Sequence, residues 1–439
     1  MLDCPAMRAT YSARRQRVLE AIRPGAVMIL PAAPLAIRNN DVEHEYRQDS
    51  DVFYLSGYDE PESLLVLTAI GDKPFVMFVR PRDPEREVWD GARAGVDGAV
   101  RDFGADIAHP ISEVTQKLPE LLQNTRRVYY RLGRDRACDD LVLGAIERVR
   151  GRAKLGISWP MEIVDPAAVL HEMRLVKSAE ELKSVRRAVE VTTEAHLLAM
   201  AKAKPGVFEY EVEAILRGVF RRAGSERPAY GPIVGSGPNA TVLHYRRNDR
   251  KMQDGDLLLI DAGCEYDYYA SDVTRTFPVS GRFSPAQRAI YEIVLDAQLA
   301  SISATRPGAT LEEVHNASVR VITDGLVRLG IVEGPVEAAI GEQRYKPYFM
   351  HRTSHWLGMD VHDVGAYFID ARPRPLLTGM IITIEPGIYI SENAGEVPVE
   401  YRGIGVRIED DVLVEPSGSS VLSAAIPKSI QDVERACAA

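Results

Sequence analysis

Histidine is concentrated in one short segment of this 439-residue chain. Three of its nine histidines, His351, His355 and His362, fall within the thirteen residues HRTSHWLGMDVHD. Imidazole titrates near neutral pH and is the commonest metal-ligating side chain, so this grouping suits proton transfer or metal binding. Gly358 and the β-branched Val361 favour a loop or a strand over a helix here. We therefore expect the histidine side chains to turn toward one cleft.

Four acidic residues stand where strands should be apolar. Asp261 ends the run LLLID, Asp272 follows eleven residues later in ASDVTRTFPV, Glu385 follows IITI, and Glu409 follows VRI. Strands as apolar as these are buried on both faces. Acids are almost never fully buried without a partner. The four positions therefore need an explanation.

Any one such acid could cap a turn or pair with an arginine such as Arg275 or Arg407. Four together are harder to explain in that way, since two carboxylates about 5 Å apart repel by roughly 3 kcal/mol at an effective dielectric of 20. With His355 they form a set of four oxygen ligands and one imidazole. This set suits Mn²⁺ best, with Co²⁺ or Zn²⁺ as alternatives. Four carboxylates also balance two divalent ions, held about 3.5–4 Å apart in two-metal hydrolases.

The elements that must position these residues belong to a mixed α+β pattern in the C-terminal part of the chain. Two hairpin-like units are expected, one carrying Asp261 and Asp272 and the other Glu385 and Glu409. A curved sheet built from such units would bring the four acids together. The segments expected in this part are strands over 254–263, 271–281, 379–390 and 403–415, and helices over 284–304 and 310–330.

The first 172 residues read as a separate α/β domain. Apolar runs such as SLLVLTAI and PFVMFVR predict strands, and segments such as DDLVLGAIERVRGRA predict helices between them. A capping box of Ser178 and Glu181 begins a long helix just after this region. Because 439 residues are too many for one ordinary core, we predict an N-terminal domain over 1–172 and a catalytic domain over 173–439.

Composition excludes several classes of partner. A net charge of −10 without a basic block argues against nucleic acid. No apolar run approaches the roughly 20 residues of a membrane span. Residues 7–37 loosely imitate a secretory signal, but their prolines favour a helix, a turn and a strand. Four scattered cysteines form no metal pair and indicate a reduced, cytoplasmic protein.

The sequence resembles the metallopeptidases of the pita-bread fold and, within them, the aminopeptidase P family. The blocks IDAGCEYDYYASDVTRTFPV, SHWLGMDVHDVG, TIEPGIYI and YRGIGVRIEDD resemble that family's metal and active-site blocks, in order. NNDVEHEYRQDSDVFYLSGYDEPESLLVL resembles its N-terminal domain, so the resemblance spans nearly the whole chain. It implies an α/β N-terminal domain followed by an α+β pita-bread domain with a curved antiparallel sheet.

The resemblance also implies a role for each member of the ligand set. Asp272 and Glu409 would contact both ions of a dinuclear centre. Asp261 would serve one ion, and His355 and Glu385 the other.

Further residues acquire roles only through this resemblance. It implies that His244, His351 and His362 support the metal ligands or contact the substrate. Arg407 would anchor the strand that carries Glu409, and Tyr389 would form part of the pocket wall.

The N-terminal domain would restrict the enzyme to chain ends. Aminopeptidases of this type are commonly homo-oligomers, which makes a dimer or tetramer the expectation, with N-terminal-domain residues closing a neighbour's site. Asp41, in RNNDVEHEYRQ, is a candidate substrate contact of this kind, and Trp89 is a second. The alternative for Asp41 is a turn or cap residue.

The implied reaction releases the N-terminal residue from peptides whose second residue is proline. Metal-bridging hydroxide would attack the scissile carbonyl, His351 or His362 would stabilise the oxyanion, and Glu385 would act as general base and then acid. An Xaa-Pro amide has no N–H, so recognition must use shape, the carbonyl and the free α-amine. His351, His362 and Tyr389 would wall the proline ring.

Three other functions share enough features to be compared. An Xaa-Pro dipeptidase (prolidase) has the same fold and ligands and differs in how the far end of the cleft is closed. Creatinase-like chemistry without metal, or a binding protein that lost catalysis, would be expected to have lost acids, and here all five positions are filled.

Arg352 departs from the family pattern, which usually has a small residue, typically glycine, after the first histidine. Arginine does not readily take the φ > 0 conformations open to glycine, so the loop could follow a different path. The side chain could point to solvent. It could instead carry positive charge toward the cleft mouth, facing an acidic peptide or the carboxyl end of a short one.

Overall fold

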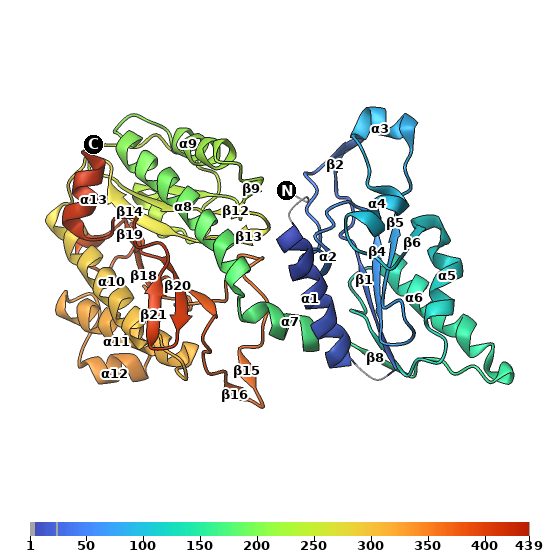
Figure 1. Ribbon diagram of the computed structural model, residues 1–439. Helices are drawn as coiled ribbons and strands as arrows, with labels where there is room; N and C mark the ends of the chain where they lie inside the picture. The colour runs from blue at the N-terminus through green and yellow to red at the C-terminus, as the bar shows by residue number, and fades with distance from the viewer. Residues whose placement is uncertain (1–4, 23–24, 439) are drawn as a thin grey trace. The chain divides into compact units, whose positions relative to one another are not determined.

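The computed structural model describes residues 5–22 and 25–438, with side chains from residue 8 onward, and the chain forms two compact units, Met1–Glu172 and Met173–Ala439 (Figure 1). Cys4 and the start of the expected Pro-Gly turn at 24–25 lie outside these ranges. Within them, no helix combines the length and apolar character of a membrane span.

The N-terminal unit is built on a mixed six-stranded sheet with the order β6-β5-β4-β1-β7-β8. β1 pairs in parallel with β7 and antiparallel with β4, which in turn is antiparallel to β5. Apolar side chains of α5 and α6 pack on it, as expected for an α/β layer. The α/β prediction is confirmed. Its strands are β1 (Ala26–Pro31), β4 (Leu64–Thr68), β5 (Phe75–Val79), β6 (Ile107–Pro110), β7 (Arg127–Tyr129) and β8 (Glu162–Val164).

Shorter elements surround this sheet. The hairpin of β2 (Ile37–Asn39) and β3 (Val42–Glu43) is exposed throughout. Its helices are α1 (Pro5–Ile22), α2 (Ser50–Ser56), α3 (Pro84–Asp90), α4 (Gly95–Arg101), α5 (Val114–Leu121) and α6 (Arg136–Arg150). The helix α7 (Ala167–Leu175) runs across the division between the two units.

The C-terminal unit combines antiparallel strand pairs with long helices, which confirms the α+β prediction. Its helices are α8 (Ala179–Lys202), α9 (Glu209–Arg222), α10 (Pro285–Ala304), α11 (Leu311–Arg328), α12 (Val336–Gly341) and α13 (Ile430–Cys437). Its strands are β9 (Arg227–Pro228), β10 (Ile233–Ser236), β11 (Leu257–Asp261), β12 (Cys264–Tyr266), β13 (Tyr269–Ala270), β14 (Thr274–Pro278), β15 (Phe368–Ile369), β16 (Arg372–Pro373), β17 (Ile381–Ile384), β18 (Gly387–Ile390), β19 (Ile404–Arg407), β20 (Asp410–Glu415) and β21 (Gly418–Val421).

Capping boxes set the starts of the long helices. The predicted box of Ser178 and Glu181 begins α8, and equivalent boxes begin α10 and α11. One apolar core joins α8, α9, α10 and α11 to β11, β14, β18 and β19. The helices therefore support the strands that carry the acids.

The strand registers place both acid pairs at ladder ends. β11 pairs with β14 up to Asp261 opposite Thr274. β17 pairs with β20 as far as Ile384 opposite Asp410, and β18 pairs with β19 from Gly387 opposite Arg407. Glu385 and Glu409 thus occupy the break between these two ladders, where their side chains are free to converge.

Candidate metal centre

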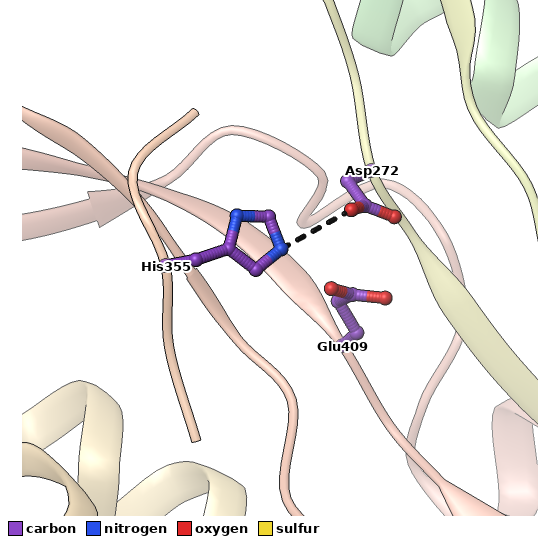
Figure 2. A group of neighbouring side chains, drawn as sticks. All are labelled: Asp272, His355 and Glu409. Carbon is purple, nitrogen blue, oxygen red and sulfur yellow. Dashed lines mark ion pairs between the residues drawn. The ribbon is translucent and has the colours of Figure 1, made fainter. Parts of the chain in front are cut away.

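Three of the predicted ligands form a compact group of donor atoms. One donor atom from each of Asp272, His355 and Glu409 lies within 4.8 Å of the other two (Figure 2). Nε2 of His355 is 3.4 Å from Oδ2 of Asp272. The three residues come from the segment between β13 and β14, the loop 351–363, and the link between β19 and β20.

Of the other two predicted ligands, Glu385 contacts this group directly, and Asp261 is linked to it through Tyr230. Oε1 of Glu385 lies 3.5 Å from Nε2 of His355. The Tyr230 hydroxyl lies within hydrogen-bond distance of Oδ1 of Asp261, at 2.5 Å, and of Oδ1 of Asp272. All five predicted ligands therefore belong to one connected set of side chains.

A glycine makes this approach of the two acids possible. A Cβ on Gly263 would stand 1.8 Å from the carbonyl oxygen of Ser271, so only glycine fits between the segments carrying Asp261 and Asp272. Asp411, fully buried, then accepts the backbone N–H of Asp272 at 3.2 and 3.3 Å through its two carboxylate oxygens. These contacts hold the Asp272 backbone in place.

The predicted ligands are close enough to one another for their negative charges to repel, which favours the binding of positive charge among them. Burial, followed by the neighbouring acids Asp272, Glu385 and Asp261, raises the pKa of Glu409 well above its usual range. Burial likewise raises the pKa of Glu385 to about 7. Burial would lower the pKa of His355, but its hydrogen bond to Asp272 and the charge of Glu385 outweigh this and raise that pKa to about 9.

This donor set fits divalent cations. Buried, mutually repelling carboxylates with one imidazole are the ligand chemistry of Mn²⁺, Co²⁺ or Zn²⁺ sites, and four negative charges match two such ions. Protonation is the alternative way to relieve the repulsion, and burial, with the charges of neighbouring acids, raises the pKa values of Asp272, Glu385 and Glu409.

Arg407 links one predicted ligand to residues outside the ligand set. Its guanidinium donates to Oδ2 of Asp261 at 2.6 Å, to the Tyr389 hydroxyl at 2.9 Å and to Oγ1 of Thr274 at 3.1 Å. It is buried, as is Tyr389. The arginine named as a possible partner of the acids is thus paired with one of them.

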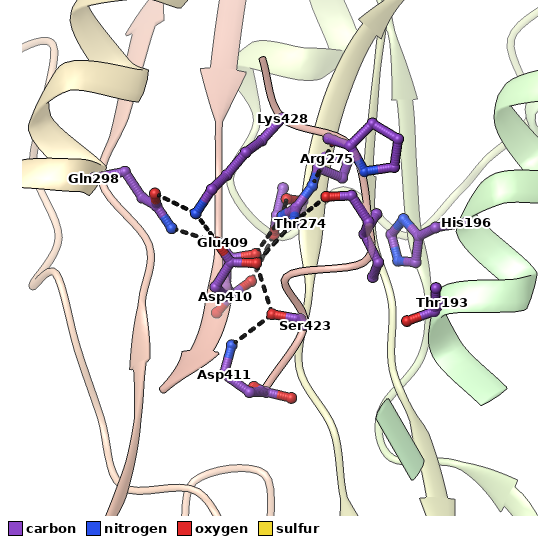
Figure 3. A network of polar contacts seen from close by, with 12 residues as sticks. Thr193, His196, Thr274, Arg275, Gln298, Glu409, Asp410, Asp411, Ser423 and Lys428 are labelled. Atoms are coloured by element: carbon purple, nitrogen blue, oxygen red, sulfur yellow. Dashed lines mark hydrogen bonds and ion pairs between the residues drawn. The ribbon is translucent and has the colours of Figure 1, made fainter. Parts of the chain in front are cut away.

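The other arginine named from the sequence, Arg275, has a different partner. It donates to Oδ1 of Asp410 at 2.7 Å and to the backbone carbonyl of Glu409 at 2.5 Å (Figure 3). Lys428 and Gln298 donate to Oδ2 of Asp410, at 2.6 and 2.7 Å. This network holds the backbone at Glu409 in place.

The three histidines of the segment 351–363 have distinct environments. Nδ1 of His351 lies 2.8 Å from the carbonyl of Arg352, and its Nε2 lies 2.9 Å from the Tyr389 hydroxyl. Burial and the charge of Arg407 lower the pKa of His351 to about 4, which keeps it neutral. Since a carbonyl only accepts, Nδ1 carries the proton and Nε2 accepts from Tyr389. Both ring nitrogens of His351 are therefore engaged.

His362 is the more available of the two flanking histidines. Its ring meets that of His355 edge-on, with centroids 4.4 Å apart, and it is exposed. The segment itself is a loop whose Trp356 is fully buried in the core. His244 is exposed in the segment after residues 237–241, and its charge bears on both His351 and His362.

A salt-bridged cluster holds the far end of this loop. Asp363, buried, accepts from Arg174 at 2.6 Å and from Lys177 at 3.1 Å. Arg174 also pairs with Asp360 at 2.8 Å. The cluster fixes the backbone immediately after His362.

A cavity of about 690 Å³ opens beside the donor group. Its walls include the three reactive side chains His355, His362 and Glu385, together with Arg352, Tyr367 and Phe368. His351 and Tyr389 lie outside this lining. Asp41 belongs to the N-terminal unit, where it is exposed in the turn between β2 and β3, and Trp89 in α3 is 84% exposed.

Several site residues could not be found from the sequence. Tyr230, Asp411 and Asp363 contact the donor group or its loop only through folding, and their local sequences carry no motif that predicts it. The run EDD at 409–411 does hint at crowded charge, but the three neighbouring acids perform three different tasks.

Comparison with known proteins places the chain among peptidases. Residues 183–416 match metallopeptidase family M24, and residues 11–129 match the N-terminal domain of aminopeptidase P. An Xaa-Pro aminopeptidase of Escherichia coli K12 is 46% identical over 97% of each chain, and one of Haemophilus influenzae is 43% identical over 97% of this chain and 96% of its own.

Solved structures give the same result. An aminopeptidase of Pseudomonas aeruginosa is 50% identical, with a TM-score of 0.97 over 100% of this chain and 99% of its own. A zinc-substituted aminopeptidase P of Escherichia coli in complex with product is 44% identical, with a TM-score of 0.95 over 98% of each chain.

Proposed function

The chain belongs to metallopeptidase family M24, and from that premise we infer that it is an Xaa-Pro aminopeptidase, releasing the first residue of peptides whose second residue is proline. The observation that carries this function is the connected set of four carboxylates and one imidazole beside a cavity, in a chain of which 97% aligns with an Xaa-Pro aminopeptidase. Residues 173–439 would carry the chemistry, and residues 1–172 the accessory N-terminal domain.

The proposed ligands are Asp261, Asp272, His355, Glu385 and Glu409. Asp272, His355 and Glu409, whose donor atoms lie closest together, would hold the metal most directly. Mn²⁺ is the proposed metal because carboxylates predominate, with Zn²⁺ or Co²⁺ as alternatives. When bound, such ions acidify a water molecule and polarise the scissile carbonyl.

Glu385 is proposed as the proton carrier. It lies at the edge of the donor set and lines the cavity. Its carboxylate would take the proton of the attacking water and deliver it to the departing proline nitrogen. A buried carboxyl group whose pKa is raised toward neutrality by its surroundings is suited to both steps.

His362 is proposed as the donor that stabilises the developing oxyanion. His351 was the other sequence candidate, but both of its ring nitrogens are engaged by Arg352 and Tyr389. His351 is therefore proposed to act through Tyr389 and Arg407, as part of the frame that holds Asp261. His244 is proposed as a wall of the entrance, and its exposure supports that role.

A homo-oligomer in the cytoplasm is also proposed. Trp89 and the β2–β3 hairpin that carries Asp41 expose apolar side chains on the N-terminal unit, as an interface between subunits would require. Three cysteines among the described residues, Cys138, Cys264 and Cys437, are free thiols, which supports a reducing compartment.

The test is peptide cleavage by chelator-treated protein, with and without added Mn²⁺. Ala-Pro-Ala should be cleaved to Ala and Pro-Ala only with metal, faster than the dipeptide Ala-Pro. Faster cleavage of Ala-Pro would favour a prolidase. Metal binding without cleavage of either peptide would indicate a binding protein.

A further inference from the structure

Arg352 is a cation without a partner beside the proposed reaction centre. Its side chain is exposed and lines the 690 Å³ cavity. In the described part of the chain, its guanidinium has no hydrogen bond or ion pair, although most arginines around the donor set do. An arginine that folding leaves unpaired has its five donors available to a ligand.

The cavity gives this charge a defined setting. Its walls combine the apolar side chains of Leu311, Tyr367 and Phe368 with the reactive groups Glu385 and His362. Apolar walls weaken solvent screening, so a charge at this position acts more strongly than on an open surface. Any substrate that brings its scissile bond to Glu385 must place a neighbouring part of the peptide in the same cavity.

The charge of Arg352 affects a neighbouring histidine of the cavity wall, His315. Burial, then the charges of Arg352 and Lys346, lower the pKa of His315 to about 4. His315 also lines the cavity and is held by Thr353 through Nδ1 at 2.9 Å. Arg352 therefore lies close enough to this wall of the cavity for its charge to disfavour the protonated form of His315.

We propose that Arg352 binds a carboxylate of the peptide substrate, so that peptides with an acidic group in the cavity are preferred over their amide counterparts. This rests on the proposed function and specifies its substrate class. A planar guanidinium matches a carboxylate with two parallel hydrogen bonds. The carboxylate could be an acidic side chain on either side of the proline or the terminus of a tripeptide.

The experiment compares three matched peptide pairs with the Mn²⁺-loaded full-length enzyme. Glu-Pro-Ala-NH2 against Gln-Pro-Ala-NH2 tests the first side chain, and Ala-Pro-Glu-NH2 against Ala-Pro-Gln-NH2 the third. Ala-Pro-Ala against Ala-Pro-Ala-NH2 tests the terminal carboxylate. In at least one pair the acid should have a kcat/KM about three- to tenfold higher, through KM, as for a partly exposed ion pair.

Variants assign that preference to the arginine. Arg352→Gln should abolish it, and Arg352→Lys should retain part of it, since the charge remains without the two-pronged geometry. Arg282→Gln is the matched control, because Arg282 is exposed but does not line the cavity. Raising the salt concentration should shrink the preference of the unaltered enzyme.

Two results would overturn the proposal and are distinguishable from failure of the proposed function. Equal kcat/KM within all three pairs would show that Arg352 faces solvent only. An acid preference unchanged in Arg352→Gln would assign it to another group. In both cases the amidated peptide Ala-Pro-Ala-NH2 is still cleaved, whereas no metal-dependent cleavage of any peptide would reject the Xaa-Pro aminopeptidase function itself.

Discussion

The Tyr389 hydroxyl donates a hydrogen bond to Nε2 of His351 over 2.9 Å. The direction of this bond follows from its neighbours. Nδ1–H of His351 donates a hydrogen bond to the Arg352 carbonyl, which leaves Nε2 as an acceptor. The tyrosine oxygen already accepts from Arg407, so its own proton points to Nε2. The pair thus connects the histidine loop to the arginine that holds Asp261. Neither residue lines the cavity.

Tyr389→Phe tests this connection. The change leaves Nε2 of His351 and one guanidinium N–H of Arg407 without a partner, both buried, at a cost of about 1–3 kcal/mol. We expect a lower unfolding free energy by that amount and a kcat/KM reduced roughly tenfold through misplacement of Asp261. Urea denaturation and steady-state kinetics measure the two effects. If the variant loses stability as expected but its kinetics are unchanged, the hydrogen bonds of Tyr389 do not influence the position of Asp261.

Asp272→Asn tests the proposed ligand set without relying on activity. In the metal-free protein, removing one of the mutually repelling charges should raise the melting temperature, because burial and Asp261 already raise the pKa of Asp272. The rise in melting temperature on adding Mn²⁺ to the unaltered protein should disappear in the variant. Thermal melts in chelator and in Mn²⁺ give both readings.

The control for that comparison is Asp296→Asn, on a helix away from the donor set. Asp296→Asn should leave the melting temperature nearly unchanged, both in chelator and in Mn²⁺. A full Mn²⁺-dependent shift in Asp272→Asn would exclude this residue as a ligand.

Tyr230→Phe should reduce the stability of the metal-free protein more than that of the metal-bound protein. The Tyr230 hydroxyl lies within hydrogen-bond distance of both Asp261 and Asp272 and can donate its proton to one of them when no cation is present. Its loss should lower the stability of the metal-free protein by about 1–3 kcal/mol and change the Mn²⁺-loaded protein less. Equal losses in the two states would show that the hydroxyl contributes only packing.

Acid should weaken the fold through buried histidines. Burial lowers the pKa of His196 to about 4, and its Nε2 is 3.0 Å from the Ala262 carbonyl. Its pKa is lower in the folded chain, so the unfolded chain takes up the proton first as pH falls. Stability is therefore lost between about pH 6.5 and 4, by about 1.4 kcal/mol per unit at most.

His196→Gln keeps a donor for Ala262 and removes this titration. Urea midpoints measured in chelator should show a loss of stability between pH 6.5 and 4.5 that is smaller by about 2 kcal/mol in the variant. His44→Gln, at an exposed position, is the control and should leave the curve unchanged. If the stability of His196→Gln falls with pH as steeply as that of the unaltered protein, His196 becomes protonated within the folded protein.

Much of the architecture could be predicted because it follows from local rules. The capping box at Ser178 and the apolar runs ending in Asp261 and Glu385 depend on residues close in sequence. Such patterns locate strand ends and helix starts, and an acid at the end of a buried strand is conspicuous for its chemistry alone.

The partners of these residues could not be predicted, because they are separated by long stretches of sequence. Asp411 supports Asp272 across 139 positions, and Arg174 holds Asp363 across 189. Arg275 and Arg407 were equal candidates as partners of the acids until strand register gave one to Asp410 and the other to Asp261. Hydrogen-bond partners over such separations depend on the register and packing of the sheets.

The amino-acid sequence by itself determined which side chains can do chemistry and at which ends of which elements they stand, since residue type and periodicity are local properties. Only the tertiary structure decided that His351 has both nitrogens engaged while His362 is exposed, that Tyr230 lies between two acids, and that Arg352 lines the cavity unpaired. The physical reason is that the direction of a hydrogen bond and the availability of a charge depend on every neighbour that folding brings near.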